Sequence, residues 1–137
     1  MRFILTIFAL LVAEFLLNCC HGPYLDGQYE GHSRSIYTSE PFVGFVKLEI
    51  KNGYIISVDY KITDTLANEI FDDQYEKHYA GNEKYIQQCR NDWKGVNTYP
   101  EKLLNLQDPK KIDAISGATW SCNIFRQSAL EALKKAH

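Results

Sequence analysis

Hydrophobic and polar residues alternate most regularly over residues 42–50 and 54–62, and this period of two predicts two β-strands. The apolar positions are Val46, Leu48 and Ile50 in the first segment and Ile56, Val58, Tyr60 and Ile62 in the second. Each strand is therefore expected to bury one face. Residues 28–35 alternate more loosely and are predicted to form a further strand.

The parity of the two apolar sets decides the predicted turn between these strands. A two-residue Asn52-Gly53 turn pairs Leu48 with Ser57 and so places an apolar residue opposite a polar one. A three-residue turn over 51–53 pairs Leu48 with Ile56 instead. We therefore predict the three-residue turn, with its glycine in the left-handed conformation.

After residue 62 the apolar spacing becomes helical. One helix is predicted from Gly81 or Asn82 to about Gly95, and a second from residues 98–101 to the Asp108-Pro109 stop. A last helix runs from about residue 120 to 136. Its apolar face consists of Cys122, Phe125, Ala129, Leu133 and Ala136. Strands followed by helices indicate an α+β fold, in which an antiparallel sheet with a central β-hairpin packs against helices.

The length and charge of the chain narrow the possible function classes. The 137 residues are enough for one compact domain and exclude a two-domain enzyme. With 15 basic and 17 acidic residues and no basic cluster, the chain has no electrostatic footprint for nucleic acid. The four histidines lack metal-ligand spacing, and there is no phosphate-binding glycine motif.

The N-terminus has the layout of an export signal. Arg2 precedes an almost continuous apolar stretch over residues 3–17, which as a helix reaches only about 22 Å, against a hydrocarbon core of roughly 30 Å. We therefore predict a signal peptide over 1–18, lipidation at Cys19, a lipid-anchored tether over 19–26 and a folded domain over 27–137. Cys20 is the alternative lipid site, and ordinary cleavage without a lipid is a further alternative. This layout places the domain outside the cytoplasm, at the bacterial periplasm or cell surface.

Two cysteines fall inside the folded domain. A disulfide between Cys89 and Cys122 would close a loop in an oxidising compartment. Both residues also lie on apolar helical faces, which two buried thiols explain equally well. The sequence leaves both possibilities open.

The segment over 112–121 is the strongest candidate for chemistry. It is a short run of small residues that leads directly into the last helix, where free backbone N–H groups and the helix dipole favour an anion. Ser116, Thr119 and Ser121 add hydroxyl groups there. The alternative is that Thr119 or Ser121 is only the N-cap of the helix and Gly117 only a turn residue.

A family resemblance gives this segment a function. The sequence DAISGAT at residues 113–119 resembles the D-x-x-S-G-A-T segment of the FMN-binding domain family, found in the C subunit of the sodium-translocating NADH:quinone reductase and the G subunit of Rnf complexes. The sequence DGQY at 26–29 resembles the opening of these domains, and the hairpin resembles their central strands. Over residues 24–136 the chain looks most like small lipoproteins called major membrane immunogens.

The resemblance implies FMN esterified through its phosphate to Thr119 by an Mg²⁺-dependent flavin transferase that uses FAD. It implies that Asp113 positions the loop or engages the transferase. The implied phosphate lining is Ser116, Gly117 and Ala118, with a further hydrogen bond from Ser121. Trp120 is a candidate to stack on the flavin ring or else a core residue, and Tyr75, Tyr79 and Tyr85 are further aromatic candidates. The chain lacks the Thr-Pro-Gly-Leu/Ile-Gly stretch common in the respiratory members, and Trp120 and Cys122 replace their usual small polar residues.

These features together predict an exported, lipid-anchored flavoprotein. It would carry one covalent FMN and relay electrons to an unidentified redox partner, as a carrier without a catalytic site of its own. The alternatives are a flavin-free surface lipoprotein that acts as a binding or structural module, and a protein that binds FMN without a covalent bond.

Overall fold

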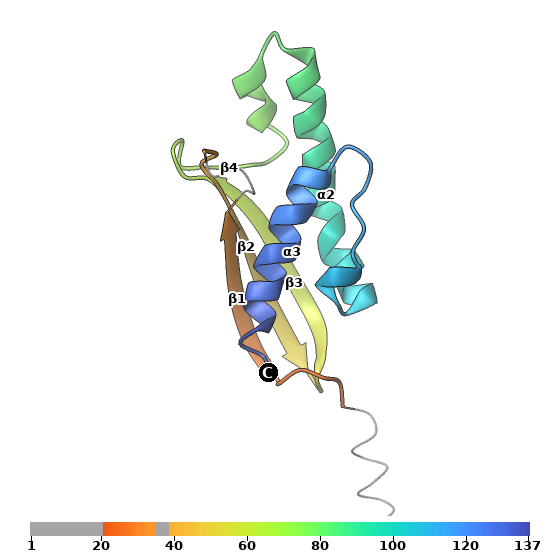
Figure 1. Ribbon diagram of the computed structural model, residues 1–137. Coiled ribbons are helices and arrows are strands. Elements are labelled where there is room, and N and C mark those ends of the chain that lie inside the picture. The colour runs from red at the N-terminus through yellow and green to blue at the C-terminus, as the bar shows by residue number, and fades with distance from the viewer. Residues whose placement is uncertain (1–20, 35–38) are drawn as a thin grey trace, which may run out of the picture.

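A four-stranded antiparallel sheet is the scaffold of the domain (Figure 1). The computed structural model describes residues 21–34 and 39–137, so the predicted signal peptide, Cys19 and Cys20 lie outside the described residues. The strands follow in spatial order as β1 (Gly27–Arg34), β2 (Phe42–Lys51), β3 (Tyr54–Asp64) and β4 (Glu69–Ile70). The predicted α+β class and the central hairpin are confirmed.

The turn between β2 and β3 differs from the prediction. Lys51 pairs with Tyr54, so only Asn52 and Gly53 form the turn. Their φ angles are 53° and 75°. Positive φ at both central positions is the geometry of a type I′ turn, which Asn-Gly favours because it matches the twist of the flanking strands. The predicted three-residue turn is therefore wrong.

A β-bulge removes the mismatch on which that prediction rested. The register shifts between Glu49 and Ile50, so Leu48 pairs with Val58. The extra residue, Ile56, is 48% exposed, and Ile55 lies in the core in its place. One inserted residue thus restores apolar pairing beyond a two-residue turn.

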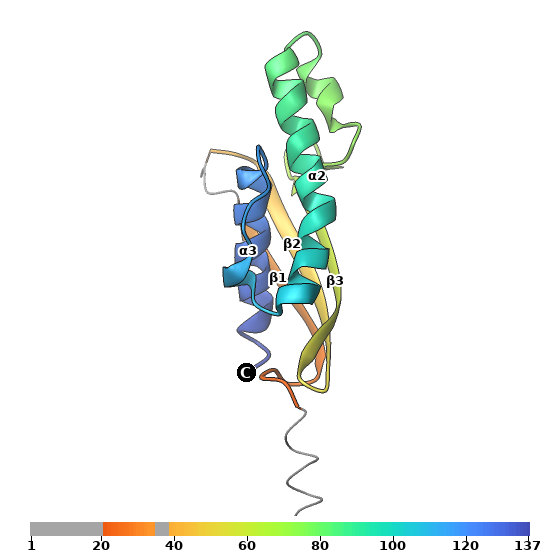
Figure 2. The same ribbon diagram turned by 90° about the vertical axis from the view of Figure 1, so that its right-hand side faces the viewer.

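Two helices lie side by side on one face of the sheet (Figures 1 and 2). Helix α3 (Thr119–Leu133) packs on β1 and β2, and α2 (Glu83–Leu106) packs on β3 and on α3. The 3₁₀ segment η1 (Tyr75–Tyr79) and the start of α2 project beyond the end of the sheet (Figure 2). A second 3₁₀ segment, η2 (Pro109–Lys111), follows α2.

Helix α2 is one continuous helix of 24 residues, where the sequence predicted two. Its predicted start is confirmed, since the Asn82 side chain accepts a hydrogen bond from the Tyr85 N–H at 3.3 Å. Gly95 and Pro100 both lie inside the helix. A Cβ at Gly95 would lie 2.7 Å from Ser121 Oγ of α3, so this glycine permits close helix packing rather than ending the helix.

The core lies between the sheet and the two helices. The predicted apolar face of the last helix is confirmed, because all five of its residues are buried. The helix itself ends at Leu133, so Ala136 lies beyond it rather than within it as predicted. Cys122 belongs to the core cluster under the centre of the sheet, and Cys89 to a second cluster with Phe71 and Tyr75. Both cysteines are free thiols, so the disulfide alternative is not realised. Burial raises the pKa of the Cys89 thiol to about 11.

The segment ahead of β1 runs along the hairpin turn. Gly22 N–H donates to Asn52 O at 2.8 Å, and Leu25 N–H donates to Ala136 O at 2.8 Å. The Asp26 carboxylate accepts from Gly53 N–H at 2.8 Å. These bonds bring residues 22–26 and the end of α3 to the same end of the molecule (Figure 1). Within residues 21–34 and 39–137, no helix has both the length and the apolar character needed to cross a membrane.

Candidate functional site

The DAISGAT segment connects η2 to α3 and ends on the first residue of that helix, Thr119. The Thr119 side chain is exposed, whereas Ala118, the N-cap residue, is fully buried and offers no side-chain cap. The alternative in which Thr119 or Ser121 is the N-cap is therefore wrong. The Thr119 hydroxyl stands in the first helical turn, where the backbone N–H groups have no intrahelical acceptor.

Helix α2 holds this connection in place from one side. The Tyr99 hydroxyl donates to Ala118 O at 2.7 Å and accepts from Ile115 N–H at 3.3 Å. Farther along α2, Lys102 Nζ donates to Asp113 O at 3.0 Å. The Asp113 side chain itself is exposed. The buried Tyr99 and the more exposed Lys102, both from one helix, thus fix the backbone of the loop and leave its outer side chains accessible.

Gly117 adopts a backbone conformation that favours glycine. Its φ is +76°, and a Cβ there would lie 2.5 Å from Asn91 Nδ2. Its carbonyl oxygen accepts a hydrogen bond from Gln88 Nε2 at 2.8 Å. The neighbouring Ser116 is exposed. The close contact with α2 and the positive φ together explain why a glycine stands at this position.

A buried carboxylate on α2 caps the start of α3. Asp92 is 3% exposed. Its Oδ1 accepts from Ser121 N–H at 3.1 Å and from Ser121 Oγ at 2.8 Å, and its Oδ2 accepts from Gln88 Nε2 at 2.6 Å. Burial raises the pKa of the Asp92 carboxyl, and these hydrogen bonds oppose that shift. Asp92 thus accepts a free N–H in place of the missing N-cap side chain, and the Ser121 hydroxyl faces α2 rather than the exposed side of the loop.

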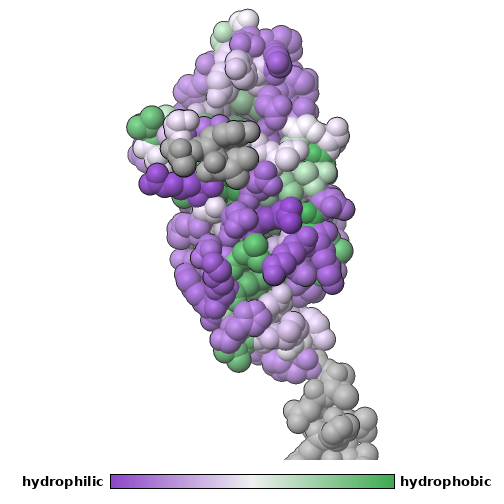
Figure 3. Space-filling view, in the orientation of Figure 1, coloured by the Kyte–Doolittle hydropathy of each residue, from purple (hydrophilic) through white to green (hydrophobic). Residues whose placement is uncertain are grey.

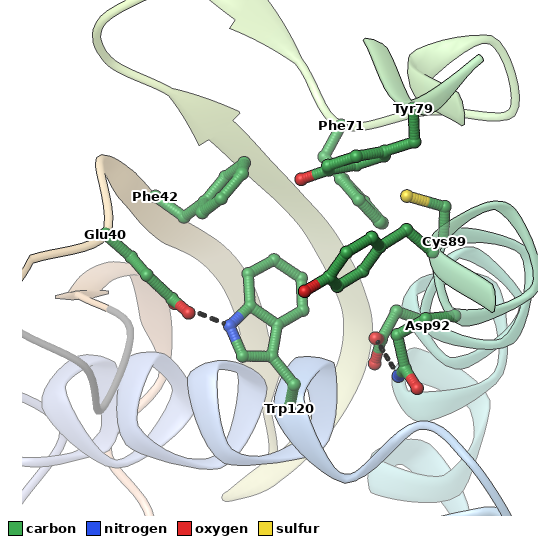
Figure 4. A pocket seen from close by; sticks show the side chains of 9 residues that line it. Glu40, Phe42, Phe71, Tyr79, Cys89, Asp92 and Trp120 are labelled. Carbon is green, nitrogen blue, oxygen red and sulfur yellow. Dashed lines mark hydrogen bonds between the residues drawn. The ribbon is translucent and has the colours of Figure 1, made fainter. Parts of the chain in front are cut away.

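An aromatic pocket of about 220 Å³ lies beside the start of α3 (Figure 4). It is lined by Glu40, Phe42, Phe71, Tyr79, Tyr85, Gln88, Cys89, Asp92 and Trp120. Trp120, the residue after Thr119, forms part of the wall and is half-buried. Its indole N–H donates to Glu40 Oε2 at 2.8 Å, and its ring centroid lies 5.1 Å from that of Phe42 and 5.3 Å from that of Phe71. Trp120 therefore both packs against the second core cluster and lines the pocket.

The three tyrosines singled out in the sequence have different places in the structure. Tyr79 and Tyr85 line the aromatic pocket, and Tyr85 is 54% exposed. Tyr75 is buried, and its hydroxyl donates to Asp64 Oδ2 at 2.6 Å. Burial, strengthened by this bond, raises the pKa of Tyr75. Tyr75 supports the wall from behind, and the other two tyrosines are accessible to a ligand.

The surface around α3 is mostly hydrophilic (Figure 3). Hydrophobic residues on this face form small separate areas rather than one broad patch. The exposed large apolar side chains of the described residues are Leu25, Tyr54, Ile56, Leu66, Ile70, Tyr85 and Leu106. They come from several different elements, so this face has no large apolar area of the kind that marks an extensive protein interface.

The site lies within a stretch of sequence that matches a known protein family. The FMN-binding domain model matches residues 39–134, a span that includes Thr119 and every residue that lines the aromatic pocket. The chain belongs to the FMN-binding domain family. It is a flavin-binding protein, and FMN is its cofactor. The resemblance that the DAISGAT segment indicated is thereby confirmed.

Two solved structures are similar to this FMN-binding domain. A crystal structure of a protein from Clostridium perfringens is similar with a TM-score of 0.58 and 22% identity, over 83% of this chain and 89% of that chain. A solution NMR structure from Clostridium thermocellum has a TM-score of 0.46 and 24% identity, over 80% of this chain and 90% of that one. No curated protein matches the chain. The likeness to the Clostridium perfringens protein supports the fold alone.

The residues present fit FMN in chemical type. Aromatic walls suit a flat ring system, and a helix N-terminus with exposed hydroxyls suits a phosphate. The structure brings Trp120, Tyr79 and Tyr85 together at one pocket beside Thr119. Sequence reasoning missed the other lining residues: Glu40, Phe42, Phe71, Gln88, Cys89 and Asp92. These six residues come from three separate parts of the chain that only the tertiary fold brings together, and no local sequence pattern marks them as a site.

Proposed function

We propose that this FMN-binding domain carries FMN covalently on Thr119, through a phosphoester, and serves as an electron carrier outside the cytoplasm. In this proposal a lipid on Cys19 anchors the chain to the membrane. A flavin transferase is its partner in maturation, and a redox partner of unidentified nature exchanges electrons with it.

The placement of Thr119 supports attachment there. Its side chain is exposed in the first turn of a 15-residue helix, where N–H groups and the helix dipole favour a phosphate. Ser116 and Gly117 beside it are exposed and slim, which leaves room for a transferase to approach. The chain needs no general base at this point, because the partner enzyme supplies the phosphoryl-transfer chemistry.

The attachment step replaces the phosphoanhydride bond of FAD by a phosphoester bond to Thr119. The Thr119 oxygen attacks the phosphorus on the FMN side of the FAD pyrophosphate, in the Mg²⁺-bearing site of the transferase. A bond forms between that phosphorus and the Thr119 oxygen, and the bond from phosphorus to the AMP portion breaks. AMP leaves, and the transferase accepts the hydroxyl proton.

The observation that carries the proposal is the juxtaposition of an exposed Thr119 with an aromatic pocket whose wall begins at the next residue, Trp120. A flavin attached at Thr119 has this aromatic pocket directly beside it as a binding site for its ring. When bound, FMN supplies the redox chemistry. The residues of the chain bind and orient the ring, and they exclude water from one side of it.

The arrangement of the ends is consistent with a lipid-anchored carrier. Residues 22–26 and the C-terminal end of α3 lie at one end of the molecule (Figure 1). Thr119 lies at the opposite, N-terminal end of α3. An anchor that precedes residue 22 therefore holds the chain at the end remote from the pocket. That arrangement presents the cofactor away from the membrane surface, toward a partner.

The test compares two variants that each remove one exposed hydroxyl from the same segment. The parent, Thr119→Ala and Ser116→Ala are coexpressed and exported with an Mg²⁺-dependent flavin transferase. In-gel flavin fluorescence is then read after denaturation. We expect fluorescence in the parent and in Ser116→Ala and none in Thr119→Ala. Covalent flavin retained in Thr119→Ala would contradict the attachment site.

The same gel separates the alternative functions. Flavin that copurifies with the native parent but is released on denaturation favours a non-covalent FMN binder. A folded parent with no flavin, under conditions where the transferase modifies a known acceptor, favours a flavin-free lipoprotein. Anchoring is tested separately: Cys19→Ser should move the protein from the membrane fraction to the soluble fraction, and Cys20→Ser should not.

A further inference from the structure

Asp92 places a buried negative charge at the aromatic pocket. The residue is 3% exposed and lines the pocket. Its hydrogen-bond donors are the Ser121 N–H, the Ser121 hydroxyl and the Gln88 amide, which are all neutral. Three donors stabilise the ionised form of a carboxyl group without cancelling its charge.

A second carboxylate, that of Glu40, lies on the opposite side of the pocket (Figure 4). It accepts the indole N–H of Trp120 at 2.8 Å. Repulsion by Glu40 adds to the effect of burial in raising the pKa of Asp92, so the electric fields of the two carboxylates overlap at the pocket. Among the residues that the structure describes, no Lys, Arg or His lines the pocket. The lining charge of these residues is thus entirely negative.

A field of this sign opposes reduction of a flavin. Two-electron reduction of the ring with uptake of one proton leaves it with one more negative charge than before. Charges near the ring nitrogens tune this equilibrium, and nearby carboxylates make the added charge less favourable. The effect is strong only where water is excluded, which is the case for Asp92.

We infer that Asp92, assisted by Glu40, lowers the reduction potential of the flavin in this pocket. The lowered potential moves the domain toward the low-potential side of its electron-transfer sequence. The inference rests on the proposed function, because it requires the flavin ring to lie in the aromatic pocket. Its consequence is that the reaction supplying electrons needs a more reducing donor than the same flavin would need without these two carboxylates. The acceptor then lies at higher potential.

The test is a reductive titration of the flavin-loaded protein with dithionite against a reference dye. Asp92→Asn and Glu40→Gln each remove one charge from the pocket. Glu30→Gln removes one from an exposed position on β1 and is the matched control. We expect Asp92→Asn to favour the reduced flavin by at least tenfold, which is about 30 mV for a two-electron couple. Glu40→Gln should change the potential in the same direction, and Glu30→Gln by less than twofold.

The outcomes separate this inference from the proposed attachment. If Asp92 is only a structural cap, its Asn variant loses stability, and the potentials of both pocket variants stay at the parent value. That result would overturn the inference. If Asp92→Asn does not fold, Glu40→Gln alone decides, since its side chain keeps an acceptor for Trp120. The same samples are then denatured to test whether the flavin is covalently bound. Flavin released on denaturation contradicts attachment at Thr119, but the measured potentials still test the role of Asp92. A parent that takes up no flavin by either route overturns both.

Discussion

Replacing Tyr99 by Phe tests whether α2 holds the attachment loop in place. The Tyr99 ring is fully buried and stacks on Phe125 with a centroid distance of 5.8 Å, so phenylalanine keeps the packing. Only the hydroxyl is lost. With it go the bond to Ala118 O at 2.7 Å and the bond from Ile115 N–H at 3.3 Å.

The expected cost follows from what each partner keeps. Ala118 O still accepts from Cys122 N–H at 3.1 Å, so this carbonyl is not orphaned. Ile115 N–H loses the Tyr99 acceptor in a half-buried setting. One net hydrogen bond and one poorly paired donor together are worth about 1–2 kcal/mol. For a domain of this size each kcal/mol lowers Tm by about 4 °C.

The assay is thermal unfolding followed by circular dichroism, with Tyr29→Phe as the matched control. The Tyr29 hydroxyl donates to Asp26 O at 3.4 Å in an exposed position, so its loss should cost less than about 0.5 kcal/mol. We also expect Tyr99→Phe to accept flavin from the transferase more slowly than the parent. An unchanged Tm together with an unchanged attachment rate would refute the view that this hydroxyl positions the loop.

Three further predictions concern other parts of the fold. Gly117→Ala should destabilise the domain by about 1–3 kcal/mol in urea unfolding, because φ is +76° and the new Cβ meets Asn91; adding Asn91→Ala should recover only the steric part. Burial favours a higher pKa for Asp64, but hydrogen bonds from Tyr75 and two backbone N–H groups outweigh it and hold that pKa below its usual value. Asp64 therefore contributes stability above about pH 4 that is lost as pH falls through the lower folded pKa, and Asp64→Asn should flatten the fall of Tm between about pH 4 and pH 2. A parent and variant with parallel pH profiles would contradict that assignment. The Cys89 thiol, with a pKa near 11, should resist alkylation at pH 8 in the native protein and react after unfolding, as located by peptide mass; rapid native labelling at this residue would show that the pocket wall opens.

The sequence was informative where one local pattern decides the structure. Alternation gave both central strands, and the apolar stripe of α3 gave its buried face. The hairpin turn could not be predicted by parity alone, because the bulge that exposes Ile56 changes the parity it depends on. Likewise Gly95 resembles a helix end in sequence, but its place in α2 is set by the close approach of α3.

The site was predictable on the side of the loop and not on the side of α2. Thr119 and its neighbours form a contiguous motif. One helical stripe of α2 meets the connection or the start of α3. Its residues, spaced by four and three positions, are Gln88, Asp92, Gly95, Tyr99 and Lys102. A mixture of amide, acid, glycine, phenol and amine has no hydrophobic periodicity, so this stripe becomes visible only once the helix is placed against the loop.

Peptide mapping of the flavin-loaded parent tests the central claim most directly. Trypsin cleavage after Lys111 and Arg126 gives one peptide, residues 112–126, which contains the hydroxyls of Ser116, Thr119 and Ser121. The account predicts that this peptide carries the FMN phosphoester and that fragmentation places it on Thr119. A flavin located on either serine, on a different peptide, or absent from every peptide of a protein that bound flavin before digestion would contradict it.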